Sequence, residues 1–297
     1  MELLKKDSLL EFNPDTLQYL RRQYDLDKPG RIEEAIDLLE EWIKKQPHFE
    51  KKDFSREYLE RTLIIFSKGS VERAKLKLDK LCAFRTLYPS FFGVHDVRKS
   101  ELLQTVKDNY RTLIIKNAAK SFPNGLLEYY QYFFLQHEYL QAYDYCNGLV
   151  VVLDYREANI LETMKALNPV ELKNAFTVSK EGYGMRIKAI HLLSNSKAIE
   201  AVVTLLKQTL SEKLSSRIMV HRTFETLHEY IPREVLPSNY GGEEMPLLEI
   251  HNVLTSKEFT DYVIEMNKAR TNEKLRVTTD DDEALGIPGS FRKLTVD

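Results

Sequence analysis

Arg186-Ile-Lys-Ala-Ile-His-Leu-Leu193 and Arg217-Ile-Met-Val-His221 are two short apolar stretches on either side of one helical pattern. Between them, from Lys197 to Ser216, apolar residues recur at three- and four-residue spacing, which is typical of an amphipathic helix. A strand, a helix and a second strand in this order predict a βαβ unit with two parallel strands. This unit decides the fold class of the chain.

The predicted helix of this unit carries an apolar stripe that becomes basic near its end. The stripe consists of Ile199, Val203, Leu206 and Leu210, and Lys213 and Arg217 continue the same line. An apolar stripe with a cationic end suits a lipid surface. The helix of a βαβ unit, however, commonly buries its stripe on the sheet, and terminal cations then complement the helix dipole. The spacing alone leaves both interpretations open.

Upstream of this unit, strand and helix patterns also alternate. Leu149-Val-Val-Val-Leu-Asp154 predicts a strand buried on both faces, as in the centre of a parallel or mixed sheet. Thr112 to Lys116 predicts a shorter strand, and Leu126 to Gly148 predicts an aromatic-rich helix. Ser100 to Tyr110 is a candidate helix, and Asn168 to Ser179 predicts another. The alternation predicts an α/β layer domain.

The first 90 residues have a purely helical pattern. Apolar residues at helical spacing predict helices over 15–24, 31–45, 55–66 and 70–87, separated by glycine or proline. We therefore predict a helical bundle over residues 1–90, an α/β domain over 91–245, and a C-terminal helix and tail over 246–297.

Composition limits the classes of function. Of the 297 residues, 43% are hydrophobic and the formal net charge is −2, which gives no global support for nucleic-acid binding. Cys82 and Cys146 form no metal-type pair, which favours a reducing compartment. Charges throughout Met1 to Leu20 interrupt any signal peptide, and the longest aliphatic run, Leu149 to Leu153, is too short to span a bilayer. We expect a cytoplasmic monomer whose membrane contact is peripheral.

Signatures of metal, nucleotide and nucleophile chemistry are incomplete. His137-Glu-Tyr-Leu-Gln141 lacks the second histidine of a zinc-protease helix, and neither a phosphate loop nor a nucleophile elbow is present. His191 and His221 are strand histidines without an accompanying nucleophile, and Asp154 suits a turn cap better than a general base. We predict that the protein needs no metal or cofactor and is not an enzyme.

A resemblance emerges at Leu236-Pro-Ser-Asn-Tyr-Gly-Gly242. This segment follows Gly148-Leu-Val-Val-Val-Leu-Asp154, the histidine strand that begins at Arg186, and Ser211-Glu-Lys-Leu-Ser-Ser-Arg-Ile218. Four such segments in this order resemble the CRAL-TRIO lipid-binding family, closest to its tocopherol-transfer and retinaldehyde-binding branch. The resemblance covers most of the chain, because the helices from Ser55 to Arg85 look like the family's N-terminal helical domain.

The resemblance implies a sheet floor and a mobile gate helix, Lys197 to Ser216, that enclose one hydrophobic ligand. The ligand-binding residues that it implies are Gln131, Leu135, Leu149, Val151, Leu153, Val178, Ser179, Tyr183, Ile199, Val203, Leu206 and Leu210. It further implies that phosphoinositide phosphates bind four cations: Arg186, Lys188, Lys213 and Arg217. Independently of the family, Arg186 and Lys188 alternate onto one strand face, while Lys213 and Arg217 are one helical turn apart.

Two departures from the family pattern concern the gate and the phosphate site. Ser194-Asn-Ser-Lys197 replaces the family's Asn-x-Pro, which predicts a less rigid entry to the gate helix. The family's basic positions in the N-terminal helices have no clear equivalent, since Lys68, Lys75 and Lys77 are only neighbours of them.

The function that we predict is binding and transfer of a small hydrophobic ligand, such as tocopherol or a retinoid, with release at phosphoinositide-containing membranes. Two alternatives stay open. A lipid-modifying enzyme would need an activated base or nucleophile inside the cavity. A protein-interaction adaptor would have its cavity filled by its own side chains.

Overall fold

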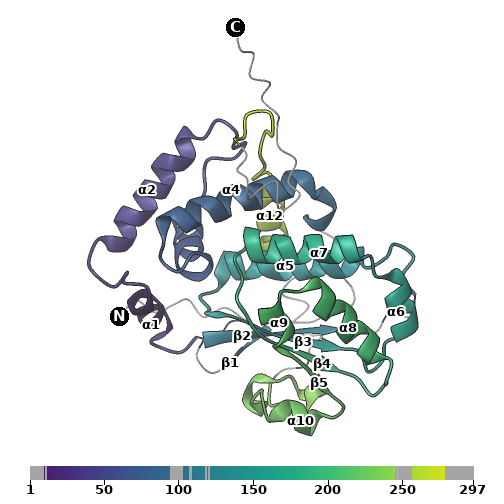
Figure 1. The fold of residues 1–297 in the computed structure, drawn as a ribbon. Coiled ribbons are helices and arrows are strands. Elements are labelled where there is room, and N and C mark those ends of the chain that lie inside the picture. Colours follow the sequence, from purple (N-terminus) through teal and green to yellow (C-terminus); the bar gives the residue numbers. More distant parts are fainter. Residues whose placement is uncertain are drawn as a thin grey trace.

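The computed structural model describes residues 10, 12–93, 103–106, 109–117, 119, 121–244, 246 and 256–277. Helices cover both faces of a single sheet (Figure 1). The chain is therefore an α/β protein with a helical N-terminal region, as its sequence predicts.

The sheet has five strands in the spatial order β1-β2-β3-β4-β5. Their bounds are β1 Leu103–Val106, β2 Tyr110–Lys116, β3 Gly148–Asp154, β4 Ile187–Leu193 and β5 Ile218–His221. Strands β2 to β5 are parallel, and β1 pairs with β2 in the antiparallel direction. The apolar strand β3 is central, as its sequence predicts, and β4 and β5 are the parallel strands of the predicted βαβ unit.

The predicted helix over Ser100 to Tyr110 is wrong. Residues 103–106 form the edge strand β1, which pairs with β2 from Leu103 opposite Leu113 to Val106 opposite Tyr110. Backbone pairing to a neighbouring strand outweighs a short local pattern. Residues 100–102, 107 and 108 of that prediction lie outside the described residues.

The N-terminal helices agree with the sequence pattern. They are α1 Thr16–Gln23, α2 Arg31–Lys45, α3 Arg56–Arg61, which continues as η1 Thr62–Phe66, and α4 Val71–Leu87. Ser55 and Ser70 cap α3 and α4, since their hydroxyls accept hydrogen bonds from the backbone N–H groups of Tyr58 and Arg73. A short helix, η2 Pro89–Phe91, follows α4.

The remaining helices lie between and after the strands. They are α5 Leu127–Tyr143, α6 Ile160–Ala166, α7 Pro169–Thr177, η4 Val178–Gly182, α8 Ile199–Thr209, α9 Glu212–Ser215, α10 Phe224–His228, η5 Arg233–Val235, η6 Ser238–Tyr240 and α12 Lys257–Met266. Helix α5 ends before the predicted Gly148, because Asp144 is extended and its carboxylate accepts hydrogen bonds from Arg111 and from the backbone N–H of Tyr145.

Alternate residues of β3 pack into two separate hydrophobic cores. Val151 belongs to the large core beneath α5, whereas Val150 and Val152 pack with Leu236 and Tyr240 on the opposite face. Figure 1 shows α5 and α7 on one side of the sheet and α10 on the other. The side chains of β3 are therefore buried on both faces of the sheet, which explains the unbroken apolar sequence of this strand.

The predicted gate helix is not continuous. Helix α8 ends at Thr209, Leu210 is extended with φ −88° and ψ 155°, and the short helix α9 begins after Ser211. The hydroxyl of Ser215 donates to the carbonyl oxygens of Lys207 and Leu210, so that it satisfies backbone groups at the break. Lys213 and Arg217 are consequently not one turn apart on a single helix, because Arg217 lies beyond the end of α9.

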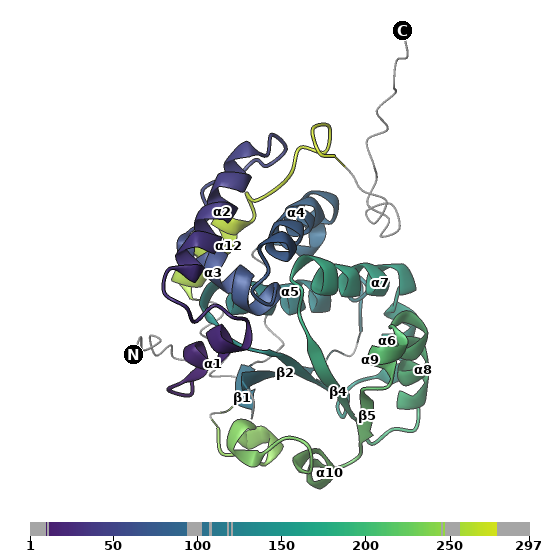
Figure 2. The same ribbon diagram turned by 60° about the vertical axis from the view of Figure 1, so that its left-hand side comes forward.

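The C-terminal segment returns to the helical region. In α12, Phe259 packs edge-on against Tyr139 of α5, with ring centroids 5.1 Å apart. Beyond α12, Arg276 pairs with Asp79 of α4. Figure 2 shows α12 among the N-terminal helices. The domain boundaries at residues 90 and 245 stay predictions.

Candidate ligand-binding site

A cavity lies between the sheet and the helices α5 to α8. Its volume is about 130 Å³, counted as the space open to the centre of a water molecule. One water needs roughly 10–15 Å³ on this measure, so the space is about ten times larger. The described lining residues are Ile115, Asn117, Leu126, Tyr129, Tyr130, Phe133, Val151, Leu153, Tyr155, Thr163, Leu167, Leu172, Ala175, Phe176, Ile187, Ile190, Val202 and Leu206.

The floor of the cavity comes from three adjacent parallel strands. Ile115 of β2 pairs with Leu153 of β3, and both side chains line the cavity. On β4, Ile187 and Ile190 line it although they are three residues apart. The register of β3 and β4 shifts between Leu149 and Val150, and this irregularity changes the alternation of β4 side chains.

Helix α8 forms one wall. Val202 and Leu206 line the cavity, and the helix packs against α6 and α7. Thr204, on the outer surface of α8, is exposed. The apolar surface of α8 therefore faces the cavity as well as the protein core, as in the interpretation that buries the stripe. Contact of this surface with a lipid stays a prediction.

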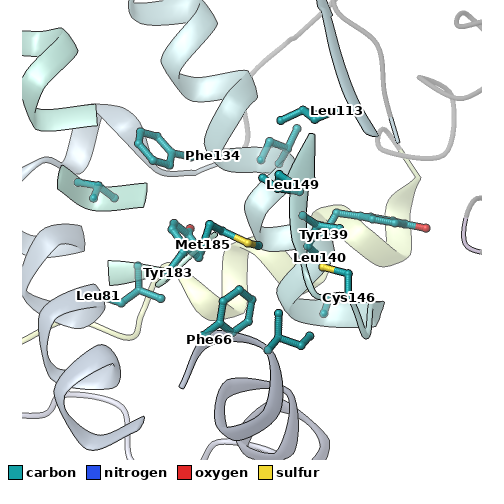
Figure 3. Packing of buried hydrophobic residues seen from close by; sticks show 14 of the residues in the cluster. Phe66, Leu81, Leu113, Phe134, Tyr139, Leu140, Cys146, Leu149, Tyr183 and Met185 are labelled. Carbon is teal, nitrogen blue, oxygen red and sulfur yellow. The ribbon is translucent and has the colours of Figure 1, made fainter. Parts of the chain in front are cut away.

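Of the twelve predicted ligand-binding residues, Val151, Leu153 and Leu206 are brought together on the cavity wall. The other nine lie outside its lining. Six of them are buried in the apolar core: Leu135, Leu149, Val178, Ile199, Val203 and Leu210. Figure 3 shows Leu149 among packed side chains that include those of Phe134 and Met185.

The three remaining predicted residues are engaged by polar contacts elsewhere. Gln131 donates to the carbonyl oxygen of Ser90 at 2.9 Å, and the hydroxyl of Tyr183 donates to Oε1 of Glu138 at 2.6 Å. Ser179 hydrogen-bonds Nε2 of His137 at 3.0 Å. Because the Nδ1 of His137 donates to a backbone carbonyl, Nε2 is the acceptor in this neutral ring.

Polar groups gather at one end of the cavity. The hydroxyl of Tyr129 donates to Oδ1 of Asn117 at 2.7 Å, and Nδ2 of Asn117 donates to Thr163 at 3.3 Å. Burial raises the pKa of the Tyr155 hydroxyl to about 12. Sequence reasoning did not predict that these residues line the cavity. Two features of the sequence could have indicated them: the aromatic pattern of α5, and the position of Asn117 and Tyr155 directly after two neighbouring strands.

The residues considered for catalysis have structural partners. Nδ1 of His191 and Nε2 of His221 are 2.8 Å apart, and burial lowers the pKa of His191 to about 4. Asp154 accepts hydrogen bonds from the backbone and guanidinium of Arg156, so it caps the turn after β3 as predicted. Among the described residues, no group of three histidine, cysteine or carboxylate side chains is arranged to hold a metal ion.

The predicted phosphate-binding cations have different surroundings. Arg186 donates to Asn147 at 3.2 Å and lies 5.7 Å from the ring centre of Tyr24, while Lys188 lies 4.5 Å from that of Tyr110. Arg217 donates to the carbonyl oxygen of Ile187 in β4. Its guanidinium therefore anchors a strand that lines the cavity.

Lys68 of the N-terminal region joins two of these cations. Its pKa is lowered by burial and by the positive charges of Arg186, Arg73 and Lys213. Each of these three residues therefore lies within electrostatic range of Lys68. Within the described part of the chain, no carboxylate forms an ion pair with Lys68, Arg73, Arg186 or Lys213. We call these four residues the basic cluster.

Two protein-family models match this chain, one over the α/β region and one over the N-terminal helices. Residues 98–242 match the family model of the CRAL/TRIO domain. Residues 98–242 are therefore a CRAL/TRIO domain. Residues 28–102 match the model described as a Pinta-like UBA domain, which overlaps the N-terminal helices. The CRAL/TRIO family binds and transfers small lipophilic molecules.

Curated relatives match about a third of this chain. An alpha-tocopherol transfer protein-like protein of Mus musculus is 30% identical over 97 residues, which are 32% of this chain and 28% of the relative. Clavesin-1 of Rattus norvegicus is 31% identical over 101 residues, which are 34% of this chain and 28% of the relative. The matches thus span less than a third of each relative's length.

A solved structure, that of Sfh5, aligns with 86% of this chain and 98% of its own chain, at 12% identity and a TM-score of 0.43. In the described part of this chain, no helix has the length and apolar character needed to cross a membrane.

Proposed function

We propose that this protein binds one small hydrophobic molecule in its cavity and transfers it between membranes. The observation that carries the proposal is the character of the lining. Each of its eighteen described residues is apolar, aromatic or uncharged polar. A pocket of this kind favours a lipophile with few polar groups. The protein is proposed to act as a cytoplasmic monomer, with tocopherol, a retinoid or a similar lipid as cargo.

We propose that α8 is the gate through which cargo passes. A buried lipophile needs a conformational step to leave, and α8 contributes both wall residues and an exposed outer surface. Its two ends are not continuous with other long helices. Ser194 to Lys197 precedes it, and the extended Leu210 follows it. A hinge at these two ends would let the helix move while the strands stay in place.

The basic cluster is proposed to bind phosphoinositide phosphates on the membrane. Four cations without carboxylate partners among the described residues suit a multiply charged phosphate group. Arg186 precedes β4, whereas Asn117 and Tyr155 follow the ends of β2 and β3. Arg186 therefore lies at the amino end of the parallel strands, opposite the polar end of the cavity. Membrane phosphate and cargo would occupy separate sites.

An enzyme and a protein-interaction adaptor are the alternatives. Lipids extracted from the natively purified protein and identified by mass spectrometry separate a carrier from an adaptor. A carrier yields one class of lipophile in near-stoichiometric amount, recovered chemically unchanged after incubation. Absence of lipid, combined with failure to bind added tocopherol or retinol, would reject the carrier. Turnover of the bound lipid would favour an enzyme.

A further inference from the structure

The hydroxyl of Tyr130 is a buried polar group whose hydrogen-bonding capacity is unused. Tyr130 lies in the first turn of α5 and lines the cavity, and its side chain is only 6% exposed. Within the described residues, its hydroxyl oxygen is inaccessible to solvent and has no hydrogen-bond partner. Buried polar groups in native proteins nearly always have a hydrogen-bond partner. We therefore expect the partner of this hydroxyl to be a molecule outside the chain.

The neighbouring polar groups are already engaged. Tyr129 donates to Asn117, Asn117 donates to Thr163, and the Thr163 hydroxyl donates to the carbonyl oxygen of Asn159 at 3.0 Å. The hydroxyls of Tyr129 and Thr163 therefore already donate within the chain. The pKa of Tyr130 is raised by burial, by Glu171 and by Tyr155, so the two hydroxyls of Tyr130 and Tyr155 lie within electrostatic range. They are the polar groups of the described lining best placed to receive a ligand.

The topology locates this polar end. Asn117 and Tyr155 directly follow the carboxyl ends of β2 and β3. Helix α5 connects these parallel strands and runs antiparallel to them, so its first turn lies at the same carboxyl end of the strands. The apolar wall residues Ile187, Val202 and Leu206 come from β4 and α8. A ligand in the cavity therefore has hydroxyl groups near it at the carboxyl ends of the strands and apolar side chains near it beneath α8.

We propose that the Tyr130 side chain shifts slightly, so that its enclosed hydroxyl opens to the cavity and binds the oxygen of a neutral head group, a hydroxyl or carbonyl. The apolar remainder of the ligand then lies beneath α8. This inference rests on the proposed function, because it specifies the cargo of the same cavity. A neutral group is required because the described lining offers no charged partner, and burying an unpaired ion is strongly unfavourable. Fatty-acid anions and phospholipid head groups are thereby disfavoured at this position.

Three probes of equal chain length test the proposal: hexadecan-1-ol, hexadecane and hexadecanoate. Their dissociation constants are measured by displacement of a fluorescent lipophile from the full-length protein. The wild type is expected to bind the alcohol most tightly and the anion most weakly. Tyr130→Phe removes one oxygen only and should weaken alcohol binding roughly two- to tenfold, the effect of one neutral hydrogen bond. Its affinity for hexadecane should stay unchanged.

Tyr143→Phe is the matched control, since Tyr143 is also on α5 but does not line the cavity. It should bind all three probes like the wild type. Equal affinity of wild type and Tyr130→Phe for the alcohol, or preferential binding of hexadecanoate, overturns the proposed head-group site. If hexadecane still binds in that case, the carrier function survives. If no probe displaces the fluorescent lipophile, both proposals fail.

Discussion

The hydroxyl of Tyr240 donates a hydrogen bond to Oδ2 of Asp154 at 2.9 Å, across 86 residues of sequence. Tyr240 belongs to the Leu236 to Gly242 segment, and Asp154 ends the central strand β3. Both side chains are almost fully buried. The bond therefore fastens the segment on one face of the sheet to the strand whose opposite face lines the cavity.

Tyr240→Phe should destabilise the protein by about 1–3 kcal/mol, because Asp154 loses one donor while it stays buried. Urea denaturation followed by circular dichroism measures the change in the free energy of unfolding. Tyr19→Phe, at a residue that is 43% exposed, is the control and should change it by less than about 0.5 kcal/mol. Identical unfolding midpoints for Tyr240→Phe and the wild type would show that this bond contributes nothing.

Acid should remove the contribution of Asp154 to stability. Burial raises the pKa of this carboxyl, but hydrogen bonds from Arg156 and Tyr240 outweigh burial, and the net pKa is lowered. A carboxyl with a lowered folded-state pKa stabilises the fold above its unfolded pKa of about 3.9, and the contribution is lost as pH falls through the folded value.

The test of this pH dependence compares urea midpoints at pH 6 and pH 3. Asp154→Asn should lose less stability than the wild type over this interval, because asparagine does not titrate. Other carboxyls contribute equally to both proteins and cancel in the comparison. An equal loss in both would contradict the assignment to Asp154.

Leu206→Asp should abolish binding of a hydrophobic ligand. The carboxylate would face the apolar cavity, where it must be desolvated or neutralised. Thr204→Asp adds the same charge to the exposed surface of α8 and should retain binding. Circular dichroism must be unchanged for the comparison to count, and ligand affinity is then measured by fluorescence. Tight binding by a folded Leu206→Asp protein would remove Leu206 from the ligand site.

Replacing Lys68 and Lys213 together by alanine should slow transfer to vesicles that contain phosphoinositides, while ligand affinity in solution stays nearly unchanged. Each cation near an anionic surface contributes about 1 kcal/mol, so vesicle affinity should fall roughly 10- to 30-fold. Arg217 is left intact because its guanidinium holds the backbone of β4.

The control for this prediction replaces Lys197 and Lys207, two exposed lysines at either end of α8, with the same loss of charge. Both double variants are compared in vesicle sedimentation and transfer assays at moderate salt, where screening is incomplete. Equal impairment of both would indicate general charge attraction rather than a phosphate site. Wild-type transfer by the Lys68 and Lys213 variant would reject the basic cluster as that site.

Dialysis against a chelator should leave ligand binding intact. Neither a metal-ligand motif in the sequence nor a suitable side-chain group among the described residues supports a metal requirement. Binding of a fluorescent lipophile before and after dialysis is the measurement. A loss of binding that added zinc reverses would show that a metal is needed after all.

The sequence by itself determined the fold class and the elements with strong apolar patterns. Apolar runs and helical spacing are local properties, so β3, the βαβ unit and the N-terminal helices follow from them directly. Periodicity also showed that Val151 and Leu153 share a strand face, and both line the cavity. Only the tertiary structure decided which other residues meet the cavity, since Leu149 shares that face yet packs in the closed core.

Tertiary structure also overrode the local pattern at two points. Pairing with β2 makes residues 103–106 a strand, and the extended Leu210 ends the gate helix before Lys213. Folding brings Lys68 into range of Arg186, although 118 positions separate them. Periodicity assigns a residue to a face of its own element, whereas space, register and neighbouring charges depend on elements distant in sequence.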